Sequence, residues 1–438
     1  MQRISRREFV KRTAVTGAAF TSLPAFLAAC GESTGTAKTT KLVVAAVQGN
    51  EDGPLKKVVG NYKSQTGIEV QVVEFPYADL FTKLVTTFQA NDSSYDLCMM
   101  DDPWMPKFGT MGALQPLDNF GFTRDSDIPA VVYDVGTWPP PHGPVPPSEQ
   151  GKAKHLYGIT IVGNVEMFMY RSDKSAAPAS WDDVLANAKT YNAPNFYGYV
   201  IRGKATNPVS SDSLPILWSF GGNIFDDNWK VQLDSSDSIT AVDFLTRKLK
   251  QYAEPGAESF DAAERSQAMA TGKAYQSTVW PGEITGIVED PSVSQVKGKV
   301  AYIPIPQGPS GKGLGMMGNW LLGIPKGSKN GQAAADFIKW MLKTDNMRNY
   351  VAQGGIPIRN SILNDASLAS ANPYFKALAA SFAAVPNWRP RTDQWGAVET
   401  SYGTAMNAAV AGQLTPQAAM QKAAGEIRTV MKAANYPS

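Results

Sequence analysis

The chain has 438 residues, more than one hydrophobic core usually supports, so we expect two domains. With 43% hydrophobic residues, its composition is that of a globular protein and excludes a largely disordered one. The 41 basic and 39 acidic residues nearly cancel, and a net charge of +2 argues against a nucleic-acid partner.

Residues 1–29 have the pattern of an export signal. A basic start, MQRISRREFVKR, precedes an uncharged run from Thr13 to Ala29 that ends in small residues. This run is shorter than the roughly 20 residues that a membrane-spanning helix needs. SRREFVK resembles the twin-arginine signal, in which Arg6 and Arg7 are read by an export receptor. The alternative is an ordinary basic signal start whose arginines are paired by chance.

The signal ends in LAAC, which resembles the bacterial lipobox. This resemblance implies cleavage before Cys30, a lipid on its thiol, and a position on the outer face of the cytoplasmic membrane or in the periplasm. Residues 30–40 are then the lipidated cysteine and a small, polar, flexible tether. Cys98 lies in the apolar run YDLCMM, where we expect an unpaired core thiol. A disulfide between Cys30 and Cys98 is the alternative.

Strand and helix patterns alternate from the start of the body. The expected strands are residues 41–48, 68–75 and 95–100, and the expected helices between them are residues 54–67 and 77–90. In the second helix, Leu80, Leu84 and Phe88 fall on one face. This order of elements predicts a mainly parallel sheet with right-handed crossovers.

Residues 138–147, WPPPHGPVPP, hold six prolines in ten residues. They predict a stiff surface excursion that is neither helix nor sheet, with a PxxP docking site as the alternative to a spacer. Beyond them we expect strands at YGITI, MFMY, 299–305 and 319–325, and helices at 180–191, 238–252, 262–272 and 331–343. The alanine-rich end, Ala397 to Ala434, also has helical spacing.

The sequence lacks the usual signs of catalysis. Its two histidines, His142 and His155, form no metal-binding spacing, and neither a catalytic triad nor a nucleotide-binding glycine motif can be assembled. We therefore expect no metal, no cofactor and no enzymatic activity. The pair Asp101 and Asp102 follows the third strand at its carboxyl end, the edge where ligands bind in open α/β sheets.

The chain is rich in tryptophan, with ten residues. Four of them have polar or glycine-rich neighbours: Trp104, Trp280, Trp320 and Trp395. An indole face can pack against the C–H face of a sugar ring, although each of these residues could equally fill the core. Trp218 and Trp340 have apolar neighbours, so we expect them in the core.

Five segments, in this order along the chain, carry a resemblance to a known family. They are LYGITIVGNVEMFMYRSD, PASWDDVLANAKTY, GGNIFDD, YIPIPQGPSGKGLGMMGNWLLGIPKGSKN and AAADFIKWML…YVAQGGIPIRNSIL. With the lipobox, they resemble the extracellular solute-binding proteins of ABC importers, in the carbohydrate-binding branch that includes maltose-binding protein. The proline-rich segment and the twin-arginine signal depart from the family pattern.

The resemblance implies an α/β, two-lobed periplasmic-binding-protein-like fold of type II. A hinge of several chain crossings joins the lobes, and a ligand cleft lies between them. We expect the first lobe at residues 41–160 plus 306–358 and the second at 161–305 plus 359–438. The implied function is a monomeric, lipid-anchored receptor that hands a sugar or polyol to the permease of an ABC importer.

The same resemblance gives candidate ligand-binding residues. From the first lobe and the crossings they are Asn50, Glu51, Tyr77, Asp79, Asp101, Asp102, Trp104, Asn164, Asn319 and Trp320. From the second lobe they are Trp280 and Trp395 as aromatic platforms, and Arg359 and Arg391 as hydroxyl donors. Arg359 could instead cap a helix or pair with an acid.

Two other functions compete with this one. A secreted lipoprotein glycosidase, or another carbohydrate-active enzyme, would need an acid and a partner carboxylate across a cleft. A ferric- or polyamine-binding receptor of similar fold would need clustered tyrosines or acids in the cleft.

Overall fold

The computed structural model describes residues 39–437. The predicted export signal with Arg6 and Arg7, the lipidation residue Cys30 and most of the tether lie outside these residues. Thr39 already contacts the body, because its hydroxyl donates to Asn330 Oδ1 at 2.9 Å. Among the described residues, no helix is both long enough and apolar enough to cross a membrane.

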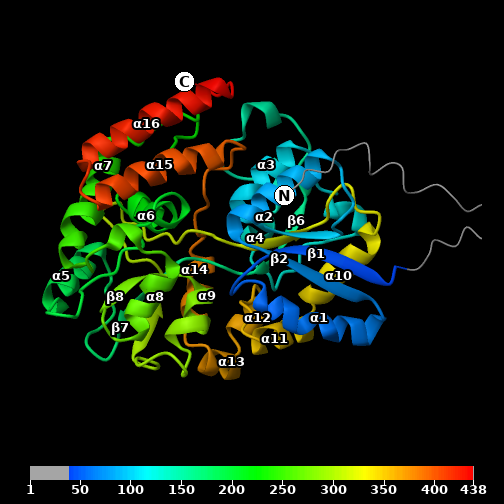
Figure 1. Cartoon of the computed structure of the whole chain (residues 1–438), viewed down its shortest axis with the longest axis horizontal. Coiled ribbons are helices and arrows are strands. Elements are labelled where there is room, and N and C mark those ends of the chain that lie inside the picture. Colours follow the sequence, from blue (N-terminus) through cyan, green and yellow to red (C-terminus); the bar gives the residue numbers. More distant parts are fainter. Residues whose placement is uncertain (1–38, 438) are drawn as a thin grey trace, which may run out of the picture. The chain divides into compact units, whose positions relative to one another are not determined.

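The first lobe is built on a five-stranded sheet with the strand order β2-β1-β3-β10-β6. Its strands are β1 (Lys41–Val47), β2 (Glu69–Phe75), β3 (Leu97–Asp101), β6 (Gly158–Val162) and β10 (Trp320–Gly323). Strand β1 runs parallel to β2 and β3, whereas β10 is antiparallel to both β3 and β6. The mainly parallel sheet is therefore confirmed, with one reversed strand that the chain adds on its return from the second lobe (Figure 1).

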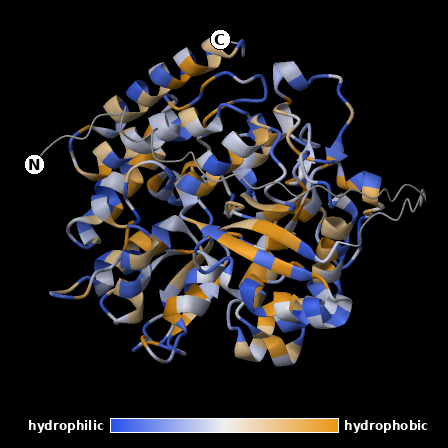
Figure 2. Cartoon of the chain, turned by 45° about the vertical axis from the view of Figure 1, so that its right-hand side comes forward, coloured by the Kyte–Doolittle hydropathy of each residue, from blue (hydrophilic) through white to orange (hydrophobic). Residues whose placement is uncertain are grey.

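Helices on this sheet bury the apolar faces that the sequence predicts. They are α1 (Gly53–Thr66), α2 (Tyr77–Gln89), α3 (Met105–Thr110), α4 (Ala130–Asp134), α10 (Gly331–Leu342) and α11 (Thr344–Ala352). Leu80 and Leu84 of α2 are fully buried, and Phe88 packs partly buried beside them. Helix α1 ends at Gly67, whose positive φ of 76° lets its N–H donate to the carbonyl of Lys63. Figure 2 shows how apolar the strands of this sheet are.

The second lobe holds a three-stranded sheet with the order β8-β7-β9. Its strands β7 (Met167–Arg171), β8 (Gln276–Val279) and β9 (Val300–Ile303) pair in antiparallel fashion. Two helices beside it start in capping boxes, α5 (Trp181–Tyr191) after Ser180 and α8 (Ala262–Ala270) after Asp261. Both helices were expected from the sequence.

A helical layer completes the second lobe (Figure 1). It consists of α6 (Asn207–Ser219), α7 (Ser236–Asp243) with a π-helical continuation over Phe244–Leu249, α15 (Trp395–Val410) and α16 (Pro416–Ala433). The predicted helical end is thus two helices, which pack against each other. The lobe is linked to the first by passages from β6 to β7, from β9 to β10, and from α11 through α12 (Asn360–Leu363) and α13 (Ala366–Ala371) to α14 (Phe375–Ala383).

The predicted surface excursion at residues 138–147 is wrong in its first part. Thr137 and Trp138 form the short strand β4, which pairs with β5 (His155–Leu156), and Trp138 is only 2% exposed. The carbonyl of Val145 accepts a hydrogen bond from the Trp229 indole at 3.2 Å. Burial of the large apolar Trp138 ring accounts for the start of this segment lying in the core.

Two predictions about single residues concern the core. Cys98 is a free and fully buried thiol on β3, and its Sγ lies 3.6 Å from the carbonyl oxygen of Gly323. Burial raises the pKa of this thiol far above its usual range. Trp218 and Trp340 are both buried, as expected.

Candidate ligand-binding site

The site is centred on two buried carboxylates that share one arginine. Asp101 ends β3 and Asp102 follows it, so both lie at the carboxyl edge of the first sheet. Arg389 reaches them from the loop before α15, and its Nη2 lies 3.0 Å from Asp101 Oδ1 and 3.1 Å from Asp102 Oδ1. The exposed fractions of the three side chains are 7% for Asp101, 1% for Asp102 and 3% for Arg389. This cluster ties the end of β3 to a segment almost 290 residues away in the sequence.

The backbone of the return crossing holds Asp102 in place. The Asn319 N–H donates to Asp102 Oδ2 at 2.9 Å, and the Asp102 N–H donates to the Asn319 carbonyl at 3.0 Å. Arg391 donates to the carbonyls of Asp102 at 2.9 Å and Val135 at 2.6 Å. Burial raises the pKa of Asp102 to about 6, although Arg389 opposes this shift. Burial lowers the pKa of Arg391 to about 10, so it stays charged at neutral pH.

Aromatic side chains gather beside Asp101. The Tyr77 hydroxyl donates to Asp101 Oδ2 at 2.9 Å. The Tyr77 ring centroid lies 4.9 Å from that of Trp104 and 6.0 Å from that of Trp320. Trp104 and Trp320 are each 6% exposed. The structure thus brings the predicted aromatic and acidic residues of the first lobe together.

The predicted asparagines lie where the chain crosses between the lobes. Asn164 and Asn319 are almost fully buried, and the side-chain oxygen of each has no hydrogen-bond partner among the described residues. The carbonyl of Asn164 accepts from the Gly318 N–H at 3.0 Å, which joins the outward and return crossings. Buried acceptors are usually paired, so these two oxygens are unusual positions in the crossings.

The two predicted platforms of the second lobe differ in exposure. Trp280 is partly exposed, and its ring lies over Gly318, where a Cβ atom would come within 2.6 Å of it. Trp395 is 3% exposed within the second hydrophobic core. Of these two rings, Trp280 is the more accessible.

Two predicted residues are placed elsewhere. The guanidinium of Arg359 pairs with Asp125 at 2.7 Å and Asp127 at 3.0 Å, and its Nε donates to the Leu342 carbonyl. Arg359 is therefore engaged by two acids of the first lobe, in line with the alternative of acid pairing. Asp79 is exposed in the first turn of α2, with no hydrogen bond to another described residue.

Asn50 and Glu51 lie in the loop after β1, at the boundary with the second lobe. The Asn50 side-chain amide donates to the Gly282 carbonyl at 3.3 Å. Glu51 is partly buried, and the charges that act on it are those of the acids Asp101, Glu283 and Asp52. Its burial, reinforced by these charges, raises the pKa of Glu51 to about 7.

The sequence did not reveal Arg389 or Glu399 as site residues. Glu399 lies one turn after Trp395 on α15 and accepts from the Asn207 side chain at 2.9 Å. Burial raises the pKa of Glu399 to about 7, and Arg389 opposes the shift. The one signal for Arg389 was the basic pair in NWRPR, since a buried pair of aspartates requires a cation.

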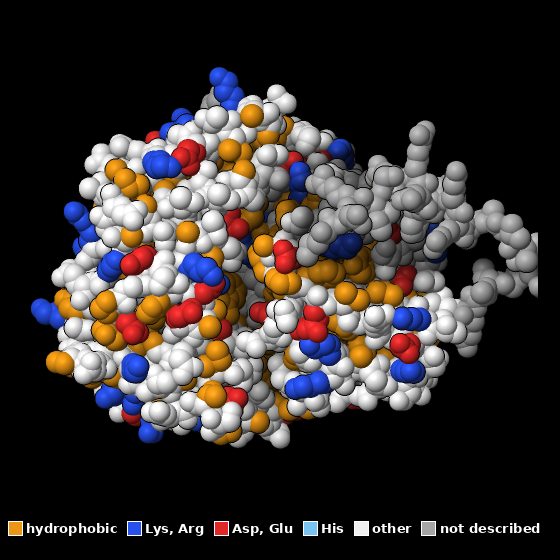
Figure 3. Space-filling view, viewed as in Figure 1, with side chains coloured by type: hydrophobic (Ala, Val, Ile, Leu, Met, Phe, Trp, Pro, Cys, Tyr) orange, Lys and Arg blue, Asp and Glu red, His pale blue; other side chains and the backbone are white. Residues whose placement is uncertain are grey.

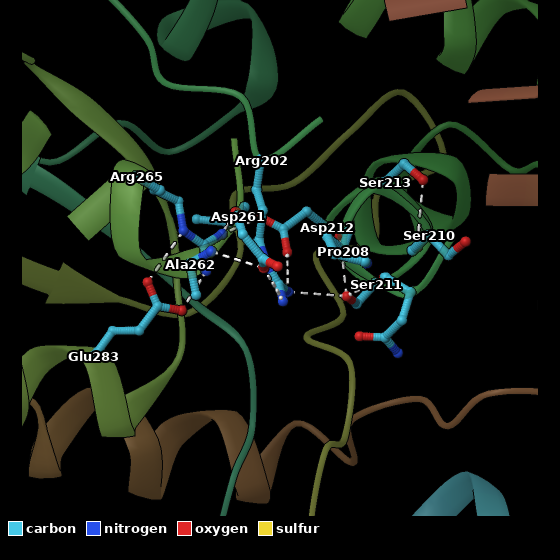
Figure 4. A network of polar contacts seen from close by, with 12 residues as sticks. Arg202, Pro208, Ser210, Ser211, Asp212, Ser213, Asp261, Ala262, Arg265 and Glu283 are labelled. Carbon is cyan, nitrogen blue, oxygen red and sulfur yellow. Dashed lines mark hydrogen bonds and ion pairs between the residues drawn. The ribbon is translucent and has the colours of Figure 1, made fainter. Parts of the chain in front are cut away.

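A second buried ion network lies inside the second lobe (Figure 4). Arg265 of α8 pairs with Asp212 of α6 and with Glu283 of α9 (Pro281–Glu283). Arg202 pairs with the same Asp212 at 3.3 Å and with Asp261 at 2.9 Å. Because buried ion pairs are costly to break, this network fixes α9, the segment that directly follows Trp280.

The surface is hollowed where the two lobes meet, and acidic side chains lie at both rims of the groove (Figure 3). A separate cavity of about 220 Å³ opens in the first lobe beside Phe88, Met111 and Lys326. None of the candidate ligand-binding residues lines that cavity. The candidate site is therefore distinct from this cavity.

Residues 46–348 match the sequence profile described as "Bacterial extracellular solute-binding protein". The chain is 25% identical over 386 residues to a probable amino-acid ABC transporter periplasmic-binding protein of Sinorhizobium fredii, covering 86% of each chain. It is 24% identical over 429 residues to the mannitol-binding protein of Pseudomonas aeruginosa, covering 90% of this chain and 94% of the relative.

A solved structure has the same fold. It is an ABC transporter solute-binding protein from Agrobacterium radiobacter K84 in complex with ribitol, with a TM-score of 0.79 at 24% identity. The similarity covers 89% of this chain and 98% of that protein. The fold is accordingly the two-lobed type II fold that the sequence predicts.

Proposed function

Because the chain belongs to the family of bacterial extracellular solute-binding proteins, we propose that it captures a sugar or polyol and delivers it to an ABC importer. The ligand lies between the lobes, in contact with the acidic and aromatic cluster of the first lobe and with Trp280 of the second. The relatives that bind mannitol and ribitol support this choice of ligand class.

The observation that carries the proposal is the Asp101–Arg389–Asp102 cluster. Its carboxylates and guanidinium compensate each other, and together they offer fixed acceptors and donors at the edge of the sheet. Hydroxyl groups both donate and accept, so they match such a mixed set without adding a charge.

The charges of the site disfavour an anionic ligand. Arg389 is engaged by two carboxylates, and Arg391 donates to two backbone carbonyls. Glu51 and Glu399 are acids whose pKa values are raised to about 7, so neither offers a cation to an anionic ligand. An amino acid or a uronic acid would bring a carboxylate that no arginine is free to pair with, so a neutral polyhydroxyl ligand fits best.

Trp280 supplies the apolar contact. Its partly exposed ring follows β8 and precedes the rigid α9, so the ring face has a fixed direction. Such a face stacks on the C–H side of a sugar or an extended polyol. The carboxylates and asparagines hydrogen-bond the ligand hydroxyls on the side opposite Trp280.

We also propose that the protein is exported by the twin-arginine route and held at the membrane through Cys30. SRREFVK and LAAC support this, since the first resembles a signal that a receptor reads and the second a lipidation site. The protein would then act on the outer face of the cytoplasmic membrane or in the periplasm.

A thermal-shift screen tests the ligand class. D-mannitol, ribitol and maltose represent neutral ligands, and gluconate and alanine serve as charged controls. A ligand at 100 times its Kd stabilises the folded state by about 2.7 kcal/mol, which moves the Tm by several degrees. We expect a shift with at least one neutral compound. Shifts with gluconate or alanine alone would overturn the proposal.

A further inference from the structure

The loop after β1 touches the second lobe at one place, the α9 turn and its π-helical continuation over Ile284–Val288. Asn50 makes the contact, because its amide donates to the Gly282 carbonyl at 3.3 Å. Glycines occupy positions 282 and 286, four residues apart and hence on the same side of the turn. Both of them face the Asn50–Glu51 dipeptide.

The loop packs against both glycines, in ordinary contact distance at Gly282 and more tightly at Gly286. A Cβ atom at Gly282 would lie 3.5 Å from the Asn50 Cβ and 3.8 Å from Glu51 Oε1. A Cβ atom at Gly286 would lie 3.2 Å from both polar atoms of the Asn50 amide. Even a Cβ atom at position 286 would therefore press on the Asn50 amide, which would have to shift by a few tenths of an ångström.

The glycines sit on a rigid support. Glu283, between them, pairs with the fully buried Arg265, which also pairs with Asp212 of α6 (Figure 4). Ser266 donates to the same Glu283 carboxylate. Since breaking a buried pair of this kind costs several kcal/mol, the turn keeps its position while the loop approaches or leaves.

We propose that Gly282 and Gly286 form a glycine seat for the Asn50–Glu51 loop, and that the fit of this loop sets how firmly the two lobes close. The seat thereby changes ligand affinity by changing how much of the protein is closed, although Gly286 itself does not contact the ligand. A ligand that touches both lobes binds more tightly when the closed arrangement is already favoured. The statement about affinity rests on the proposed function, whereas the statement about closure does not.

Seating also brings like charges together. In the seated loop, Glu51 faces Asp101 of β3, Glu283 of α9 and Asp52 of its own loop, and Tyr350 of α11 lies near it. Burial first, and then these acids, raise the pKa of Glu51 to about 7. A carboxyl whose pKa is higher in the seated state than in the open state stabilises the seated state when it is protonated. The population of the closed arrangement should therefore fall as pH rises through about 7.

A disulfide test of the seat needs no ligand. The Cβ separation of 3.5 Å between position 50 and a side chain at 282 falls in the range of natural disulfides. In a Cys30→Ser background of the full chain, Asn50→Cys with Gly282→Cys should crosslink under mild oxidation. Asn50→Cys with Gly425→Cys, at an exposed helical glycine with open space around it, should not. Equal crosslinking in both pairs, or none in either, would overturn the proposal.

A steric test measures closure and affinity. Gly286→Leu should enlarge the radius of gyration in small-angle X-ray scattering at pH 6, while the matched Gly425→Leu should leave it unchanged. If D-mannitol or ribitol binds the wild type, Gly286→Leu should weaken that binding at least tenfold at an unchanged Tm. An unchanged radius for Gly286→Leu would refute the seat.

Two further outcomes separate the proposals. The radius of the wild type should grow between pH 5.5 and 8.5, and Glu51→Gln should remove this dependence. A wild type that crosslinks and opens with pH, but binds no neutral compound, would contradict the proposed ligand class and leave the seat intact.

Discussion

Replacing Arg389 with methionine should strongly destabilise the protein at neutral pH. Methionine has a similar length but carries no charge, so Asp101 and Asp102 would lose their shared cation. Both carboxylates are buried, and a buried ion pair that loses one partner costs about 3–5 kcal/mol. The tyrosine hydroxyl on Asp101 and the Asn319 amide on Asp102 would remain, so the lower half of this range is expected.

The loss of folding stability caused by Arg389→Met should increase with pH. Burial already raises the pKa of Asp102 to about 6, and loss of Arg389, which opposes that shift, would raise it further. A carboxyl whose folded-state pKa is raised above its unfolded value destabilises the fold as pH rises through that range. Arg389→Met should therefore lower the free energy of unfolding more at pH 7 than at pH 5, where Asp102 is mostly protonated.

Urea unfolding at pH 7 and pH 5 measures both effects. Arg389→Met combined with Asp102→Asn should cost less at pH 7 than the sum of the single changes, because the unpaired charge is gone. A loss below about 1 kcal/mol at pH 7, or an equal loss at both pH values, would refute the account of the cluster.

Other predictions follow from single side chains. Trp280→Ala should weaken sugar or polyol binding by about 10- to 150-fold in calorimetric titration with little loss of stability, since roughly 1.5–3 kcal/mol of apolar contact is removed. Trp340→Ala, by contrast, should lower the free energy of unfolding by about 3–5 kcal/mol, because its ring is buried against Phe337 and Tyr62. Cys30→Ser should release the protein from the membrane fraction, and a variant that still sediments with membranes after salt washing would contradict lipid anchoring. Arg6→Lys with Arg7→Lys should abolish export while conserving charge, and normal export would indicate the general secretory route.

Local patterns predicted much of the fold. Alternating strand and helix periodicities located the first three strands and both helices between them, and Ser180 and Asp261 began two expected helices. Helix α6 had no such signal, because its buried surface runs from Pro208 to Ser219 and surrounds it on all sides. A helix buried on every face has no amphipathic pattern, and its two prolines argued against a helix.

The candidate site was predicted only in part, because half of it is made by distant segments. The Asp101–Asp102 pair was visible from its place after a strand. The arginine that neutralises it comes from a loop almost 290 residues later, and no local pattern distinguishes Arg389 from Arg391 or Arg359. The same limit applies to Asn50 and the glycine seat, since only the folded chain brings residues 50 and 282 together.

The lobe boundaries at 160, 305 and 358 remain predictions. Arg359, predicted in the second lobe, pairs with Asp125 and Asp127 of the first. The chain between α11 and α14 therefore contacts the first lobe although it was predicted in the second, as expected of a hinge segment that passes between two lobes. The alternative of a carbohydrate-active enzyme loses its basis, because the chain belongs to a family of binding proteins.

Calorimetric titration of ribitol, D-mannitol and maltose into the wild type and Asp101→Asn tests the central claim most directly. The carboxylate of Asp101 lies at the carboxyl end of β3, held by Tyr77 and Arg389. We expect at least one of the three neutral ligands to bind the wild type with a Kd in the micromolar range or below, and Asp101→Asn to weaken it by roughly tenfold or more, the loss of a charged hydrogen bond. Binding that is unchanged in Asp101→Asn, or binding only of charged compounds, would contradict the account.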